Sequence, residues 1–135
     1  MDAEFRKKIL IVDTEAKAAG ELKAFLEKNE YSVRHNADCR QALDAIQNWK
    51  PDLVILNILV QTFNPLAFIS DIRKNPFTEN QKIIICSKTP KIDIVAGPSP
   101  KVKGYLTKPV DFEKLKATLA KALSGVSTQA RAGKL

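Results

Sequence analysis

Features that mark several common functional classes are scarce in this chain of 135 residues. No apolar run approaches the roughly 18 residues that a membrane-spanning helix needs. The charged N-terminus has no apolar core of signal-peptide length behind it, so we expect a cytoplasmic protein. Cys39 and Cys86 fit no metal-binding or redox spacing, which favours reduced thiols, with Cys86 buried. The segment Val12-Asp13-Thr14-Glu15 contains no glycine, which excludes a glycine-rich loop for nucleotide phosphates.

Acidic residues are scarce in the second half of the chain. Residues 1–81 carry 11 Lys and Arg against 12 Asp and Glu, a net charge of −1. Residues 82–135 carry 11 Lys and Arg against only three acids, a net charge of +8. A charge distribution this uneven bears on which partners the chain attracts.

Apolar runs alternate with segments of helical spacing along most of the chain. We expect buried strands at 8–12, 31–34, 53–56, 83–86 and 103–106. Helices are expected from about Thr14 to Asn29, at 38–49, from about 65 to 75 and from about 111 to 123. Between the last two strands, prolines limit a helix to roughly residues 90–96. The pattern predicts an α/β fold: a five-stranded parallel sheet, doubly wound as (βα)5, in three layers.

The helical periodicity ends near Ser124. We therefore expect residues 1–124 to form one domain and residues 125–135 to form a flexible C-terminal tail. Such a tail could also be a linker to a further domain.

Polar residues follow the predicted strands at the point where each strand ends. Asp13 and Thr14 follow the first strand, Asn57 the third, Ser87 the fourth and Lys108 the fifth. Ligands bind open α/β sheets at the carboxyl ends of the strands. Taken singly, each residue could merely cap a helix or a strand. Taken together, they predict a crevice that joins a carboxylate, an amide, a hydroxyl and an amine.

The motifs around these residues resemble the receiver domain of two-component response regulators, over about residues 6–124. The carrying segments are Ile9-Leu10-Ile11-Val12-Asp13, Pro51-Asp52-Leu53-Val54-Ile55-Leu56-Asn57, Ile84-Ile85-Cys86-Ser87 and Gly104-Tyr105-Leu106-Thr107-Lys108-Pro109. The resemblance implies a CheY-like, flavodoxin-like fold and a role in phosphorelay signal transduction. It also implies that Ser87 and Tyr105 are switch residues and that Lys108 is the phosphate-pocket lysine.

The chain departs from the family pattern at the residues that the resemblance assigns to phosphorylation. Working receivers hold magnesium with two adjacent acids and the phosphoacceptor aspartate, and only Asp13 remains here. Thr14 stands in place of the second acid, and Asn57 stands in place of the phosphoacceptor. An amide is a very weak nucleophile, and magnesium prefers anionic oxygen. We therefore expect no phosphorylation at Asn57, weak or absent magnesium binding, and no resident cofactor.

The charge of the pocket leads to a hypothesis about Lys108. Asp13 and Lys108 sum to zero without a metal, so we expect a direct ion pair or a shared hydrogen bond through Asn57. Glu15 could replace the missing acid, although a position early in the helix favours an interaction with the helix dipole.

The leading functional hypothesis is a degenerate receiver that acts through protein–protein interaction and is not an enzyme. In the family, the fourth helix, fifth strand and fifth helix form the usual partner surface, which is basic here. Its lysines are Lys88, Lys91, Lys101, Lys103, Lys114, Lys116 and Lys121. We expect an acidic protein partner, such as a signalling kinase or an effector, and no membrane.

Three alternatives remain open. The lysines could be a solvated face without a partner, or the same surface and the tail could contact nucleic acid, although aromatic interleaving is absent. A conventional receiver could use another acceptor, either Ser87 or Asp52. Asp52 precedes its strand and should lie at the opposite end of the sheet, and His35 is expected to follow the second strand at some distance from Ser87.

Overall fold

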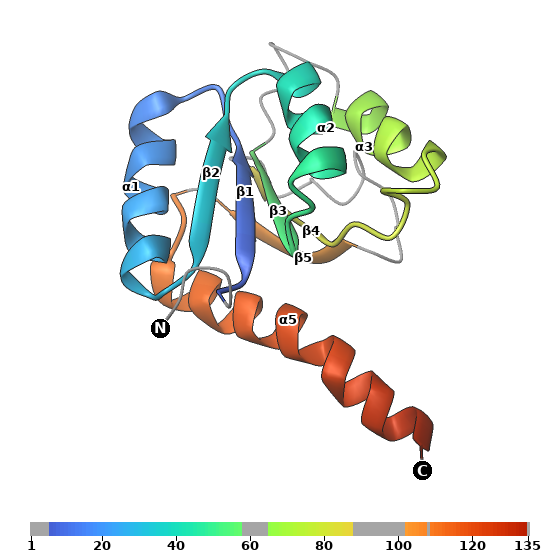
Figure 1. The fold of residues 1–135 in the computed structure, drawn as a ribbon. Coiled ribbons are helices and arrows are strands. Elements are labelled where there is room, and N and C mark those ends of the chain that lie inside the picture. The colour runs from blue at the N-terminus through green and yellow to red at the C-terminus, as the bar shows by residue number, and fades with distance from the viewer. Residues whose placement is uncertain (1–5, 58–64, 88–101, 108, 135) are drawn as a thin grey trace.

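The computed structural model describes residues 6–57, 65–87, 102–107 and 109–134. Its elements are β1 (Lys8–Val12), α1 (Ala16–Lys28), β2 (Ser32–Asn36), α2 (Cys39–Asn48), β3 (Leu53–Asn57), α3 (Pro65–Lys74), β4 (Ile83–Ser87), β5 (Val102–Thr107) and α5 (Phe112–Lys134). The five strands form one parallel sheet in the order β2-β1-β3-β4-β5. Figure 1 shows α1 and α5 on one face of the sheet and α2 and α3 on the other. The predicted doubly wound α/β fold is confirmed.

Alternation along the strands divides the core into two layers. In β1, Ile9 and Ile11 pack with α1 and α5, whereas Leu10 and Val12 pack with α2 and α3. β3 repeats the pattern, because successive side chains of a strand point to opposite faces. Both faces are covered, which explains why the strands read as continuous apolar runs rather than as alternating ones. The odd-numbered positions of β1 and β3 therefore lead toward the layer of α1 and α5.

Two helix starts are fixed by aspartate side chains. The Asp38 carboxylate accepts the backbone N–H groups of Arg40 and Gln41 at 2.7 and 3.3 Å. The Asp111 carboxylate does the same for Glu113 and Lys114 at the start of α5, at 2.9 and 3.2 Å. These caps satisfy N–H groups that have no partner within the helix.

The helix α5 packs closely against β5 at Gly104. A Cβ added to Gly104 would lie 2.8 Å from Cγ2 of Thr118, so only glycine fits this crossing without a shift. On the other side of the layer, the rings of Phe25 and Phe112 stack with centroids 4.5 Å apart and join α1 to the start of α5. The start of α5 therefore packs against α1, and the part of α5 around Thr118 packs against β5.

Two features differ from the sequence-based expectation. The helix α5 continues to Lys134, where a tail without regular structure was expected after Ser124, and Figure 1 shows it projecting from the body. No proline interrupts residues 112–134, so backbone hydrogen bonding can continue beyond the amphipathic part. His35 is also inside β2, in register with Ile11, rather than after it. The short helix expected at residues 90–96 lies outside the described residues.

Candidate functional site

The site is centred on a buried pair formed by Asp13 and Asn57. Val12 pairs with Leu56 across β1 and β3, so the next residue of each chain segment stands side by side. Both continue the odd-numbered series that faces α1 and α5. Each side chain is only 3% exposed, and Nδ2 of Asn57 donates to Oδ1 of Asp13 at 2.6 Å. The predicted convergence of these two residues at the carboxyl ends of the strands is confirmed.

The orientation of the Asn57 amide determines the chemistry of the pair. Its N–H group faces the carboxylate, so a buried anion receives a short hydrogen bond from a neutral donor. The same Oδ1 of Asp13 also accepts the backbone N–H of Glu15 at 2.8 Å. The amide oxygen of Asn57 is buried and has no hydrogen-bond partner among the residues that the structure describes. An aspartate at position 57 would place an acceptor against an acceptor here.

The side chain of His35 contacts the backbone of Asp13, and the sequence analysis did not predict this contact. Its Nε2 lies 2.7 Å from the carbonyl oxygen of Asp13, and the neighbouring Asp13 N–H donates to the carbonyl of Asn36 at 3.1 Å. The alternation of side chains along β2 could have indicated this position. Val33 packs in the α1 and α5 layer, and His35, two residues further on, lies on the same face of the strand. These contacts hold the chain where β1 ends.

The other predicted site residues are placed only in part. Thr14 is half-buried directly after Asp13. Ser87 is the last residue of β4, and Tyr105 in β5 is in register with Ile85. Lys108 lies outside the described residues, so its pairing with Asp13 stays a prediction.

Asp52 lies at the opposite end of the sheet from Asp13, as expected. Its carboxylate accepts the backbone N–H of Lys8 at 2.7 Å, and its own N–H donates to the Lys8 carbonyl at 2.8 Å. These bonds place Asp52 where β1 and β3 begin. It is therefore not part of the crevice.

The two cysteines have the states that the sequence favours. Both are free, and Cys86 is 2% exposed within the core. Burial and, to a smaller degree, the Asp38 carboxylate raise the pKa of the Cys39 thiol. A raised pKa disfavours the reactive thiolate.

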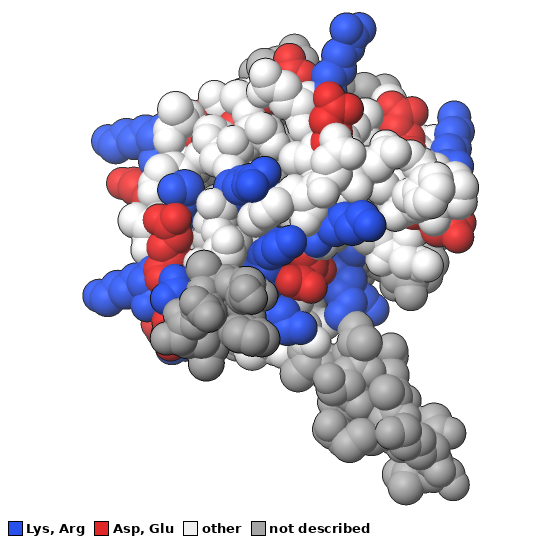
Figure 2. Space-filling view, in the orientation of Figure 1, with Lys and Arg blue, Asp and Glu red and all other residues white. Residues whose placement is uncertain are grey.

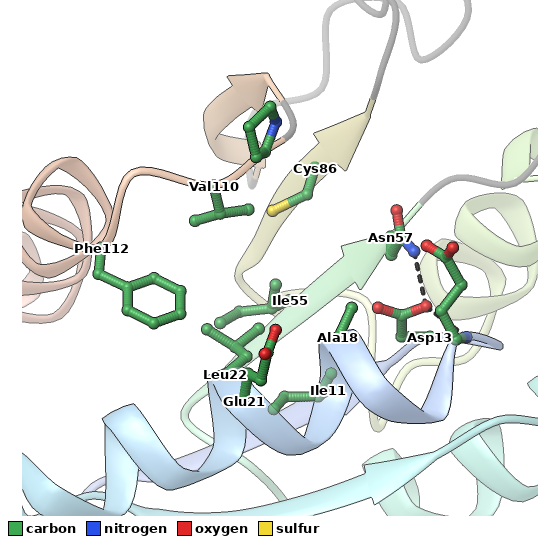
Figure 3. Close-up of a pocket in the computed structure, with 12 residues that line it drawn as sticks. Ile11, Asp13, Ala18, Glu21, Leu22, Ile55, Asn57, Cys86, Val110 and Phe112 are labelled. Carbon is green, nitrogen blue, oxygen red and sulfur yellow. Dashed lines mark hydrogen bonds between the residues drawn. The ribbon is translucent and has the colours of Figure 1, made fainter.

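A cavity of about 530 Å³ opens beside the Asp13–Asn57 pair, between α1 and the β5–α5 connection. Figure 3 shows the two residues at one end of it and Phe112 at the other. Its apolar walls are formed by Ile11, Leu22, Ile55, Cys86, Val110 and Phe112. Glu15 and Glu21 bring two further carboxylates to the lining. Glu15 is thus near the pair, but it precedes α1 as its N-cap residue rather than standing in the first turn.

Two further kinds of feature are absent from the described ranges. No group of three or more His, Cys, Asp or Glu side chains there could hold a metal ion. No helix in those ranges combines the length and apolar character that crossing a bilayer requires.

Fold and site together define a doubly wound α/β domain with a polar pair at the carboxyl ends of its central strands. The model of the response regulator receiver domain matches residues 9–120. The chain belongs to this family of two-component signalling domains.

Individual relatives agree with this assignment. The chain is 31% identical over 119 residues to Protein PilH of Pseudomonas aeruginosa, covering 87% of the chain and 98% of PilH. It is 33% identical over 112 residues to the response regulator ArlR of Staphylococcus saprophyticus, covering 83% of the chain and 50% of ArlR. The chain thus spans about half the length of that relative. The solved chemotaxis response regulator CheY4 of Vibrio cholerae shares the fold, with a TM-score of 0.74, 23% identity, and coverage of 87% of the chain and 98% of CheY4.

Proposed function

We propose that this chain is an atypical receiver domain that is not phosphorylated at the usual position and signals through protein–protein contacts. One observation carries the proposal: the side chain at that position is an amide whose N–H group is hydrogen-bonded to Asp13 at 2.6 Å in a buried pair. The lone pair of an amide nitrogen is delocalised into the carbonyl group, so this nitrogen is a very weak nucleophile toward a phosphoryl donor. The domain acts as a binding module in the cytoplasm and not as an enzyme.

The donor set of the pair supports weak or absent magnesium binding. Magnesium requires near-octahedral coordination by hard oxygens and gives up its water reluctantly. Asp13 offers one carboxylate, whose Oδ1 already accepts two hydrogen bonds. Asn57 turns its nitrogen, not its oxygen, toward that carboxylate. These groups do not fit the ion that the family uses.

Acetyl phosphate tests this proposal directly. We expect the wild-type chain, incubated with acetyl phosphate or fluoroberyllate and magnesium, to show no saturable NMR shifts at the backbone amides of Ser87 and Tyr105. Intact mass should show no added phosphoryl group. The same additions without magnesium serve as the control. Saturable, magnesium-dependent shifts at both residues would show that the site works as a conventional receiver.

The partner surface of the proposal lies on β5 and α5. The apolar stripe of α5 is buried through Leu115 and Leu119, which turns its lysines outward. Lys114, Lys116 and Lys121 are exposed and Lys103 is half-buried, whereas Lys88, Lys91 and Lys101 lie outside the described residues. Figure 2 shows Lys and Arg side chains interspersed with Asp and Glu side chains on the face of the molecule that it draws. Salt screens charges on such a surface. A partner with an acidic surface fits it, and a signalling kinase or an effector is the expected class.

The double variant Lys114→Glu/Lys121→Glu should remove most of the binding to such a partner, since it places two negative charges where an acidic surface docks. In pull-downs, wild-type binding should also fall steeply when ionic strength rises from about 0.05 M to about 0.3 M, as the Debye length shortens by a factor of about 2.5. The control is Lys17→Glu/Lys28→Glu, which makes the same charge change at exposed positions of α1. Equal loss in both double variants, or binding that is insensitive to salt, would refute docking on α5.

A further inference from the structure

The cavity beside the Asp13–Asn57 pair has the size and lining of a ligand site. Small-molecule pockets are typically about 300–1,000 Å³, mostly apolar, with a few polar groups placed at defined points. This one measures about 530 Å³. Apolar side chains from three strands, α1 and the β5–α5 connection form its walls, and its polar groups are gathered at the Asp13–Asn57 end and along α1 (Figure 3).

The cavity is held open by packing outside it. The ring of Phe112 is stacked on Phe25 at 4.5 Å, so it forms a wall and does not fill the space. On the opposite wall, α1 presents Ala18, whose methyl group leaves room that a larger residue would occupy. Leu22 lies one turn further along α1 and is buried. The space therefore follows from how α1 and the start of α5 are fixed to each other.

The charge of the lining opposes the charge of the chain. The chain carries a net charge of +7. The described residues that line the cavity nevertheless include three acids, Asp13, Glu15 and Glu21, and no Lys or Arg. Glu21 is exposed at the rim and makes no ion pair or hydrogen bond with the residues that the structure describes. Figure 3 shows its side chain rising from α1 beside Leu22. At the inner end lies the buried amide oxygen of Asn57, to which no described residue donates a hydrogen bond.

We propose that this cavity binds a small apolar molecule carrying one cationic group. The apolar body lies between Ile55, Val110 and Phe112, and the cation lies against the carboxylate of Glu21. An anion of the same shape is disfavoured, because it would meet the carboxylate of Glu21 at the rim. The site goes beyond the loss of phosphorylation and does not depend on it, since a receiver that still took phosphate could hold such a ligand as well.

The probe for this site is 4-phenylbutylamine, compared with the neutral 4-phenyl-1-butanol and the anionic 4-phenylbutyrate. Binding is followed by NMR shifts of the Ile11, Ile55 and Val110 methyl groups. We expect saturable shifts with the amine, weaker binding of the alcohol and the weakest binding of the acid. Glu21→Gln should lower the affinity for the amine about fivefold, as expected for one partly exposed ion pair, and leave the alcohol unchanged.

Two matched variants test the location. Ala18→Phe fills the cavity and should abolish binding of the amine, whereas Ala24→Phe adds the same ring at an exposed position of α1 and should leave binding intact. Thermal unfolding checks that both variants fold. If Ala18→Phe does not fold, the effect of Glu21→Gln on the affinity for the amine tests the location of the site. The proposal is overturned if the amine gives no saturable shifts, if the acid binds as well as the amine, or if both alanine variants behave alike.

Discussion

Asn57→Asp should destabilise the domain by about 3 kcal/mol at pH 7, the typical effect of leaving a buried charge uncompensated. The wild-type pair is 3% exposed at each residue and joined by an N–H···O bond of 2.6 Å. The substitution removes that donor and sets a second carboxylate against the first. Chemical denaturation at pH 7 measures the difference between the two proteins.

The loss should shrink as the pH falls. Burial and the neighbouring negative charge raise the pKa of the introduced carboxyl above its unfolded value of about 3.9. The folded variant then binds more protons than the unfolded chain, so its stability is highest below that unfolded value and declines as the pH rises through the folded one. Unfolding measured between about pH 4 and pH 8 should therefore show the wild type and the variant diverging toward high pH.

A swap of the two side chains is the control. Asp13→Asn/Asn57→Asp keeps one carboxylate and one amide in the pair, so it should recover at least about half of the lost stability if complementarity is the cause. A single variant that is as stable as the wild type at pH 7, or a swap that is no better than the single variant, would show that the Asp13–Asn57 bond does not stabilise this pocket.

The architecture and the central pair could be predicted because both follow from local rules. The apolar runs of β1 and β3 and the helical spacing of α1 predict their elements to within about two residues. Parallel pairing and alternation then bring Asp13 and Asn57 to the same face, and the register confirms it. The same alternation rule, applied to β2, would have predicted that His35 lies on this face as well.

Other features depend on atoms that distant segments supply. The direction of the Asn57 amide is set by what surrounds it, and no sequence pattern encodes that direction. The cavity is open because Phe112 stacks on Phe25 instead of filling the space. This contact joins two helices that are far apart in sequence, so no local sequence pattern predicts it. The continuation of α5 beyond Leu123 was missed because amphipathic periodicity reports burial, not helicity alone.

Efficient phosphorylation should require both of the missing acids. Thr14→Asp/Asn57→Asp would place three carboxylates at the ends of β1 and β3, the oxygen-rich set that magnesium prefers. We expect this double variant to incorporate phosphoryl groups from acetyl phosphate at least about tenfold faster than Asn57→Asp alone, which corresponds to a difference of about 1.4 kcal/mol in the barrier. Intact mass against time, with and without magnesium, measures the rates.

The four combinations at positions 14 and 57 separate the two requirements. Thr14→Asp with Asn57 retained should bind magnesium more tightly than the wild type, as seen by NMR titration of the Asp13 amide, yet take no phosphoryl group. Asn57→Asp alone supplies the nucleophile but leaves the ion with one carboxylate too few. If Asn57→Asp alone were phosphorylated rapidly and in a magnesium-dependent manner, Thr14 would be irrelevant to the ion. The inactivity of the wild-type site would then rest on the amide of Asn57 by itself.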